Sequence, residues 1–209
     1  MGWIDKIETQ MQSLLSLSNE TTGVEDTNLT DAINRLIGGY VYSIDTRENI
    51  NHVLNSILAA SSVEGNSMNF AAANAGDGDS NTRWASKYPS TYDSDSGFDT
   101  DPWLKVRFNR LTLIKQINIK LFERNVRPTP SNVQQFSIKY LDMNNNEGYI
   151  VQNYKNNTSG SGYNSTITIV LDEVKIVKEI KLCEFIIAGQ EWNNIGVVEL
   201  EAYSNEQTT

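Results

Sequence analysis

The spacing of apolar residues changes near residue 61, and this change constrains the fold more than any other feature of the sequence. Before it, apolar residues recur three or four positions apart, as on one face of a helix. After it, they alternate with polar residues, as in half-buried strands. The alternating stretches are 104–108, 117–121, 136–140, 167–171 and 198–202. Short alternating strands joined by Asn-, Gly- and Ser-rich loops predict an all-β sandwich.

The first 61 residues are predicted to be a small helical region, with the sandwich occupying 62–209. Three helices are expected in this region. The apolar faces of the first and third helices are Ile4, Ile7, Met11, Leu14 and Leu15, then Ile50, Val53, Leu54, Ile57 and Leu58. Between them, Thr30 is placed to cap a helix that Gly38 and Gly39 end. Each apolar stripe requires a partner surface, so the region is expected to serve attachment or oligomerisation.

Charge and composition exclude several classes of protein. The 209 residues include 17 basic and 26 acidic side chains, a net charge of −9, which argues against binding to nucleic acid or anionic lipid. Cys183 is the single cysteine, so no intrachain disulfide forms, and its apolar surroundings predict a buried thiol. The N-terminal segment has no apolar core of a signal peptide, and we expect synthesis in a bacterial cytoplasm without insertion into a membrane.

Residues 74–86 form the most informative segment. Asp77 and Asp79 flank Gly78, which can adopt a positive φ and allow a tight turn. Such a turn directs side-chain and backbone oxygens inward, as a hard cation requires, and Thr82 can add a hydroxyl. An acidic turn without a metal remains an alternative.

At these residues the sequence resembles the discoidin, or coagulation-factor type C, domains and related bacterial carbohydrate-binding modules. The family's run Ala-Ile-Asp-Gly-Asp-x-x-Thr-x-Trp-x-Ser matches residues 75–86, with Gly76 in place of the Ile. Residues 102–106, 135–140 and 198–203 resemble later strands of that family, in the same order. The resemblance implies a mainly β, galactose-binding-like jelly-roll sandwich.

The resemblance also implies a structural calcium ion between the Asp-rich loop and the last strand. Asp77 and Thr82 would supply side-chain oxygens, and Asp79 a backbone carbonyl. The remaining ligands implied are a carbonyl of Asn74 or Ala75, the carboxylate of Glu199 and the carbonyl of Val198. Trp84 and Trp103 are expected in the core.

In sugar-binding members of the family, the ligand lies on loops at one end of the sandwich. Three loops supply candidates here, and the predicted ligand-binding residues are Tyr88, Tyr92, Glu123, Arg124, Asn125 and Trp192. An aromatic ring such as Trp192 can stack on a sugar face while polar groups bind its hydroxyls. Packing of the two tyrosines within their loop, and an ion pair for Arg124, remain alternatives. Many galactose-binding relatives carry a histidine that has no counterpart here, which puts galactose specificity in doubt. The single histidine, His52, is expected on the surface of the helical region.

Catalysis is not expected, because one histidine and one cysteine in different segments assemble no nucleophilic triad. Residues 19–40 resemble an element of phage tail and baseplate proteins. This implies a homo-oligomeric virion protein, attached to other tail proteins by its helices, whose sandwich binds a cell-surface glycan that the sequence does not identify. Two alternatives are a structural assembly protein whose sandwich binds protein, and a cell-adhesion or lipid-binding module, which the polar loops disfavour.

Overall fold

The computed structural model describes residues 44–87, 99–122, 132–156, 166–188 and 195–207. They belong to one compact unit, Ile44–Thr209, which begins earlier in the chain than the boundary suggested at residue 61. The first two expected helices lie outside the described residues. Within those residues, no helix is long and apolar enough to cross a membrane.

The described residues form seven strands, and every strand pair is antiparallel. The strands are β1 (Ile57–Ala60), β2 (Trp84–Ala85), β3 (Leu104–Leu121), β4 (Asn132–Leu141), β5 (Glu147–Lys155), β6 (Thr166–Ala188) and β7 (Gly196–Tyr203). Three short 3₁₀ helices lie between β1 and β2: η1 (Glu64–Asn66), η2 (Met68–Phe70) and η3 (Ala72–Gly76).

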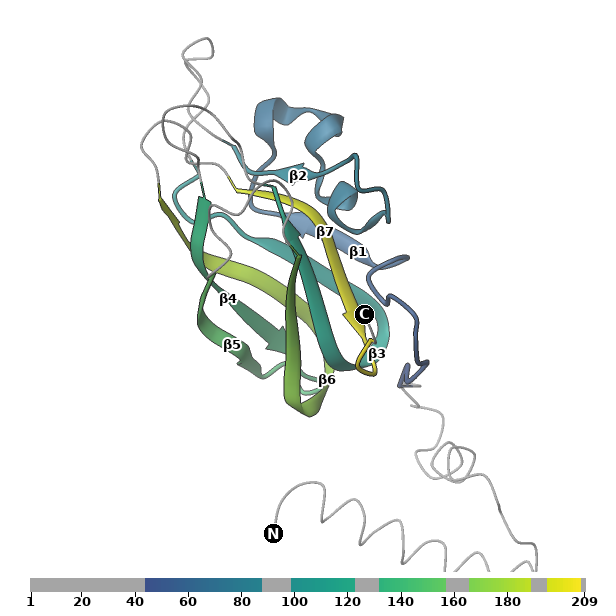
Figure 1. The fold of residues 1–209 in the computed structure, drawn as a ribbon. Coiled ribbons are helices and arrows are strands. Elements are labelled where there is room, and N and C mark those ends of the chain that lie inside the picture. The colour runs from purple at the N-terminus through teal and green to yellow at the C-terminus, as the bar shows by residue number, and fades with distance from the viewer. Residues whose placement is uncertain (1–43, 88–98, 123–131, 157–165, 189–194, 208–209) are drawn as a thin grey trace, which may run out of the picture. The chain divides into compact units, whose positions relative to one another are not determined.

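Strands β3 and β6 each pass through both layers of the fold. The beginning of β3, up to Arg107, pairs with the second half of β6, and its end, from Gln116, pairs with the first half. Register shifts between these parts mark β-bulges, which bend a strand. The bends divide one hydrogen-bonded path into two layers, β1-β3-β6-β4-β5 and β2-β7-β3-β6 (Figure 1). The predicted β-sandwich is confirmed.

The core lies between the layers and contains the apolar residues of the alternating stretches. Leu104, Val106, Ile117, Ile119 and Leu200 are all fully buried. The core also takes in Trp84 at 0% exposure, and the sole cysteine at 4%, as the sequence predicted. Trp103 is only partly buried, at the edge of β3, where Lys105 and Lys181 lie over its ring.

The third expected helix is wrong, because residues 51–56 form turns and Ile57 begins β1. Asn49 and Asn55 have positive φ values of 57° and 85°, which no helix accommodates. The side-chain oxygen of Asn51 accepts hydrogen bonds from the amides of Val53 and Ala202, tying this segment to β7. The apolar residues of this segment therefore do not form one buried face. Val53 packs in the core, whereas Ile57 is exposed on an edge strand.

His52 is buried at 8% exposure, so its expected surface position is also wrong. Its Nε2 lies 2.7 Å from Ser204 Oγ, and Ser204 in turn donates to the carbonyl of Leu113. Because Ser204 uses its proton there, Nε2 carries the histidine proton and donates. Burial lowers the pKa of His52, partly offset by the nearby Asp45 carboxylate. The ring is a neutral, buried tie between the N-terminal segment and β7.

The structure explains why Gly76 stands where the family's run has an isoleucine. A Cβ at this position would lie 2.6 Å from Val53 Cγ1 and 3.0 Å from a methyl carbon of Leu58. A Cβ atom essentially never lies 2.6 Å from another carbon, so a side chain here requires Val53 to move, and the contact with Leu58 is also tight. The turn segment and β1 therefore fill the space that the isoleucine would occupy.

Candidate functional site

The six predicted ligand-binding residues, Tyr88, Tyr92, Glu123, Arg124, Asn125 and Trp192, lie outside the residues that the structure describes. The residues that flank them are described, however, and they come together. The amide of Ser86 donates to the carbonyl of Ile195, and the amide of Ile195 donates back to the Ser86 hydroxyl, each at 2.8 Å. The amide of Phe122 donates to the carbonyl of Gly196 at 2.9 Å. The three segments that carry the candidates therefore start or end at one place in the fold.

Asp99 anchors the end of the first of these segments. Its Oδ2 accepts hydrogen bonds from the hydroxyls of Ser61 and Ser62. Ser62 Oγ accepts the amide of Lys87, and its carbonyl accepts the indole N–H of Trp84 at 2.9 Å. Ser62 thus joins residues 87 and 99, and Asp99 is a structural acceptor.

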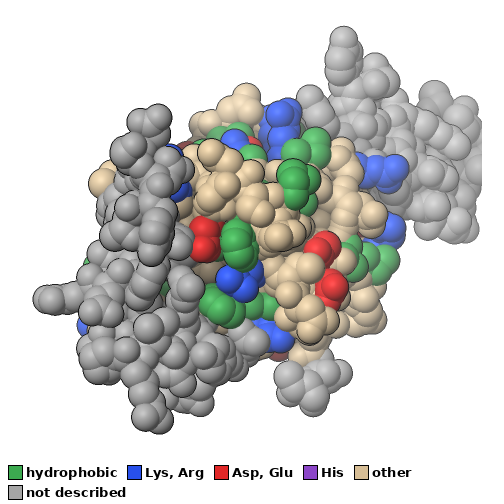
Figure 2. Space-filling view, turned by 90° about the horizontal axis from the view of Figure 1, so that it is seen from above, with side chains coloured by type: hydrophobic (Ala, Val, Ile, Leu, Met, Phe, Trp, Pro, Cys, Tyr) green, Lys and Arg blue, Asp and Glu red, His purple; other side chains and the backbone are tan. Residues whose placement is uncertain are grey.

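Sequence reasoning did not identify Arg83 at this end of the domain. Its guanidinium carbon lies 4.0 Å from the ring centroid of Phe122 and 4.6 Å from that of Phe70, an arrangement of cation–π contacts. Phe122 directly precedes the segment of Glu123, Arg124 and Asn125, so this stack fixes where that segment begins. Hydrophobic, basic and acidic side chains lie interspersed at this end (Figure 2).

Three of the other predicted metal ligands, Asn74, Asp77 and Asp79, surround the hydroxyl of Thr82. Its Oγ1 lies 2.8 and 3.1 Å from the two carboxylate oxygens of Asp77, 2.9 Å from the carbonyl of Asp79 and 3.2 Å from the carbonyl of Asn74. All four neighbours are acceptors, and the hydroxyl has one proton to donate. Oxygens about 3 Å apart are also the spacing of a calcium shell with ligand distances of roughly 2.3–2.6 Å.

The other groups of the loop keep these oxygens facing inward. Gly78 has φ 79°, as its place between the two aspartates predicted, and the amide of Asp79 donates to Asp77. The Asp79 carboxylate binds the amide and side chain of Asn81, which leaves its carbonyl for the cluster. The side-chain amide of Asn74 donates to the carbonyl of Asn69 at 2.9 Å, so Asn74 also offers its backbone oxygen.

Glu199 brings a second carboxylate from β7. It is 9% exposed, and neither carboxylate oxygen has a hydrogen-bond partner within the described part of the chain. Burial, with repulsion from Asp77 and Glu201, raises the pKa of Glu199 to about 7. The amide of Gly78 partly offsets this rise without reaching hydrogen-bond geometry. Leaving a buried carboxylate unpaired is costly, so this site requires a compensating charge or a proton.

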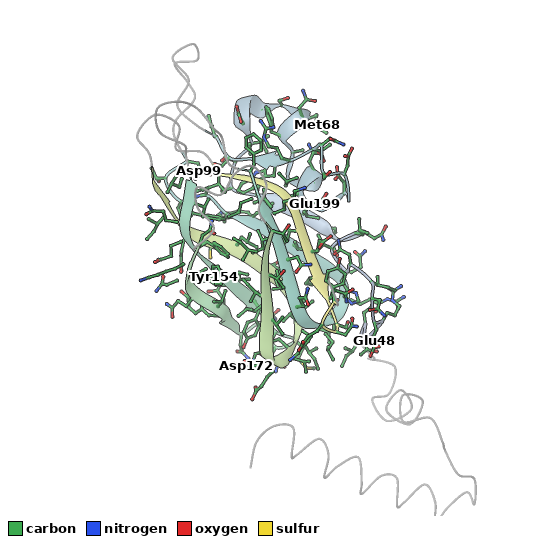
Figure 3. All side chains as sticks on the ribbon, in the orientation of Figure 1. Glu48, Met68, Asp99, Tyr154, Asp172 and Glu199 are labelled. Carbon is green, nitrogen blue, oxygen red and sulfur yellow. The ribbon has the colours of Figure 1, made fainter. Side chains whose placement is uncertain are left out.

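A β-bulge frees Val198 beside it. Leu121 pairs with Val197 and Lys120 with Glu199, so Val198 is an extra residue without a partner on β3. Gly78, Ser80 and Glu199 line a common hollow of about 230 Å³, which places the Asp-rich loop against β7. Figure 3 shows Glu199 on the strand of β7 below the 3₁₀ helices.

The donor set therefore fits a hard cation. The observation that supports this fit is the buried carboxylate of Glu199, whose oxygens have no hydrogen-bond partner among the described residues. Among the described residues, no three His, Cys, Asp or Glu side chains form a metal-binding group. The set consists instead of two carboxylates, one hydroxyl and backbone carbonyls, which is a mixture that calcium accepts and softer metals do not favour.

Comparison with known proteins places this geometry in a family. The sequence profile of the NedA-like, galactose-binding domain matches residues 74–182, just over half of the chain. Comparison with curated proteins finds no significant match.

Solved structures of carbohydrate-binding modules share the fold. Chitosan-binding module 1 from a chitosanase/glucanase of Paenibacillus sp. IK-5 is 20% identical, with a TM-score of 0.54 over 74% of this chain and 98% of that one. The family 32 module of Clostridium perfringens NanJ, in complex with galactose, is 21% identical, with a TM-score of 0.53 over 73% and 96%. A C. perfringens module in complex with GalNAc-β-1,3-galactose is 18% identical, with a TM-score of 0.55 over 73% and 97%. At these identities the likeness establishes the fold alone.

Proposed function

The chain belongs to the family of NedA-like, galactose-binding domains, and on this premise we propose that it is a non-catalytic carbohydrate-binding protein. The glycan binds at the end of the sandwich where Ser86, Phe122 and Ile195 meet. Tyr88, Tyr92, Glu123, Arg124, Asn125 and Trp192 provide the contacts. The solved modules in complex with galactose and with GalNAc-β-1,3-galactose support this class of ligand.

The convergence of the three flanking segments is the observation that carries the proposal. Candidates from three distant parts of the sequence, near 90, 124 and 192, can meet one ligand only if their segments start from a common place. The hydrogen bonds between Ser86 and Ile195, and between Phe122 and Gly196, supply that place. The Arg83 stack on Phe122 adds a rigid base of the kind that a preorganised site requires.

Calcium has a structural role in this proposal. Asp77, Thr82 and Glu199 would hold the ion with the carbonyls of Asn74 and Asp79, and Val198 lies beside them. When bound, calcium neutralises the two carboxylates and joins the Asp-rich loop to β7. Ala75, the alternative to Asn74 as a carbonyl ligand, is fully buried.

We expect glycan binding to depend on Trp192 and Arg124. Trp192→Ala and Arg124→Ala should each weaken binding by at least about tenfold, or 1.4 kcal/mol, because stacking and charged hydrogen bonds are lost. A glycan array and host cell-wall polysaccharide are the first probes, followed by titration calorimetry on the best ligand. Tyr149→Ala on β5 and Arg107→Ala on β3 are matched controls, since both side chains are exposed on strands and neither belongs to the three candidate segments.

The comparison of loop and control variants tests the site when the variants keep the melting temperature of the wild type. Loss of binding with the loop variants alone supports the site, whereas equal loss with the controls contradicts it. A folded protein that binds no glycan would favour a structural protein whose sandwich binds another protein of its assembly.

The particle context rests on the sequence of residues 19–40 and on the helical spacing of apolar residues in the sequence before residue 43. We place the protein in a phage tail or similar particle, with residues 1–43 holding copies together and the sandwich displayed outward. Light scattering of the full chain should give the mass of an oligomer, and removal of residues 1–43 should give a monomer. A monomeric full chain would contradict this arrangement.

A further inference from the structure

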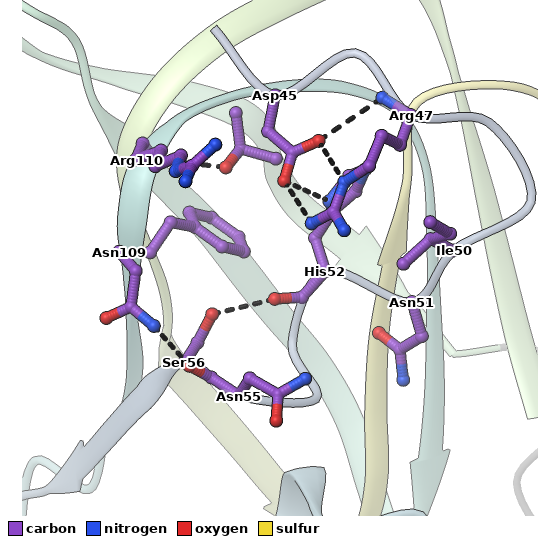
Figure 4. Close-up of a pocket in the computed structure, with 11 residues that line it drawn as sticks. Asp45, Arg47, Ile50, Asn51, His52, Asn55, Ser56, Asn109 and Arg110 are labelled. Atoms are coloured by element: carbon purple, nitrogen blue, oxygen red, sulfur yellow. Dashed lines mark hydrogen bonds and ion pairs between the residues drawn. The ribbon is translucent and has the colours of Figure 1, made fainter. Parts of the chain in front are cut away.

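A second polar pocket lies at the other end of the domain from the meeting place of Ser86, Phe122 and Ile195. Its volume is about 390 Å³, and the segment 45–56 and the bend of β3 enclose it (Figure 4). Glu48, within this segment, and Asp99 lie toward opposite ends of the domain (Figure 3). We propose that this pocket binds a monosaccharide-sized sugar acid, a hydroxylated ring with one carboxylate, independently of the loop site. The inference does not rest on the proposed function.

A large bulge in β3 builds one wall of the pocket. Arg107 pairs with Glu179 and Thr112 with Val177, so residues 108–111 of β3 stand opposite Lys178 alone. Bulges turn side chains away from the alternation of a strand. Here Asn109 and Arg110 are both exposed although they are adjacent, and both line the pocket. In a regular strand, the side chains of Asn109 and Arg110 would point to opposite faces of the sheet.

The charges of the pocket favour an anion. Asp45 is its only acidic lining residue, and Arg47 binds it through two side-chain hydrogen bonds of 2.8 and 2.6 Å. Those bonds, above all, lower the pKa of Asp45 to about 2, so the pair is neutral at physiological pH. Arg110 has no acidic partner among the described residues. Arg110 therefore contributes to the pocket lining a positive charge that no ion pair among the described residues neutralises, in a protein whose net charge is −9.

The remaining wall offers groups for hydroxyls and a ring. Asn55 lines the pocket with a φ of 85°, a strained conformation for a residue with a side chain. The amide of Asn109 holds the carbonyl of Asn55, so the turn is fixed from across the pocket. Phe108, at 7% exposure, supplies a small apolar surface. His52, whose buried ring is fixed by Ser204, also lines the pocket.

Together these groups match one chemical class. A guanidinium binds a carboxylate through paired, charge-assisted hydrogen bonds, which are stronger than those it donates to the uncharged hydroxyls of a neutral sugar. Two asparagine side chains can donate to and accept from hydroxyls, and a pocket of this size accommodates a single ring. Simple carboxylates such as acetate lack the hydroxyl contacts, and neutral sugars lack the charge.

The test is titration of the full chain with D-glucuronate and D-galacturonate, followed by calorimetry and by amide chemical shifts of 15N-labelled protein. We expect a Kd in the millimolar range or tighter for at least one uronate. Glucose and acetate should bind at least tenfold more weakly. The shifts should move at Asn55, Asn109 and Arg110.

Variants separate a specific site from general attraction of anions. Arg110→Gln should weaken uronate binding at least tenfold, whereas Arg107→Gln, the exposed neighbour outside the pocket, should leave it unchanged. Asn55→Gly removes an amide while relieving the positive φ, so reduced binding without loss of melting temperature supports the pocket. Equal binding of glucose or acetate, shifts confined to Phe122 and Gly196, or no binding overturns the inference. Trp192→Ala should not affect uronate binding here, which distinguishes this site from the loop site.

Discussion

Adding calcium to the metal-free protein at pH 7.5 should raise its melting temperature by about 5–10 °C. Calcium at a hundred times its Kd stabilises the folded state by about 2.7 kcal/mol. For a domain of this size, each kcal/mol shifts the melting temperature by roughly 2–4 °C. Scanning calorimetry in calcium, in magnesium and in chelator measures the effect, and magnesium should give much less because it demands stricter octahedral geometry.

The pKa of Glu199 sets how this effect depends on pH. Without a metal its folded-state pKa of about 7 exceeds the ordinary value of 4.5, so the folded state holds its proton more tightly than the unfolded chain. That contribution to stability is fully present below pH 4.5 and is lost as pH rises through 7, by up to about 3 kcal/mol. Calcium requires the deprotonated carboxylate, so the stabilisation it provides should shrink at pH 5.

Glu199→Gln provides the sharpest version of this experiment. The variant should lose its response to calcium, yet in chelator at pH 7.5 it should be at least as stable as the wild type, because no buried charge remains. Glu201→Gln, two residues along β7 and partly exposed, is the control and should keep the response. A wild-type melting temperature that is indifferent to calcium, or a Glu199→Gln variant that responds normally, would remove the ion from this site.

The sequence predicted the Asp-rich loop well because its constraints are local. Asp77, Gly78 and Thr82 lie within one turn, and the positive φ and the hydrogen bonds follow from their spacing. Glu199 is more than a hundred residues away, and nothing in its own surroundings indicates a buried carboxylate. Only the resemblance of the last strand to a known family linked it to the loop, and the orphaned oxygens are the independent sign of that link.

The sequence did not predict the polar pocket between segment 45–56 and the bend of β3, for a physical reason. Segments 45–56 and 108–112 meet through tertiary contacts such as the bridge between Asp45 and Thr112. The first segment has helical spacing of apolar residues, but its asparagines adopt conformations that end a helix. In the second, Leu111 and Thr112 are buried side by side, so the alternation that identifies strands fails at the bend. For the same reason the two predicted strands at 104–108 and 117–121 are one continuous strand.

Strand β5 and the second half of β6 were both missed, for different reasons. Strand β5 has no fully buried side chain, so its residues alternate little in hydrophobicity. The second half of β6 does alternate, and Ile180 and Leu182 are fully buried, so a count of its pattern would have found it. Packing partners, rather than local preference, decide such cases.

Replacing Trp84 with alanine should cost about 3–5 kcal/mol of folding free energy, the largest loss expected from a single substitution in this domain. The side chain is fully buried where β2 pairs with β7. Its indole N–H donates to the carbonyl of Ser62, and truncation leaves that carbonyl without this partner. Urea denaturation followed by circular dichroism gives the change, and Trp84→Phe, which keeps most of the volume, should lose less.

Trp103→Ala is the matched comparison, because both tryptophans were expected in the core and only one is there. Trp103 is partly buried, and its ring contacts Lys105 and Lys181 at 5.7 and 5.3 Å. Cation–π contacts at such exposed sites contribute about 0.5–1 kcal/mol each, so this variant should lose less than half as much as Trp84→Ala. Equal losses at the two positions would mean that the β2–β7 end of the core is no better packed than the outer face of β3. The hydrogen-bonded meeting place of the loop segments, which depends on that packing, would then lack the rigidity that glycan binding requires.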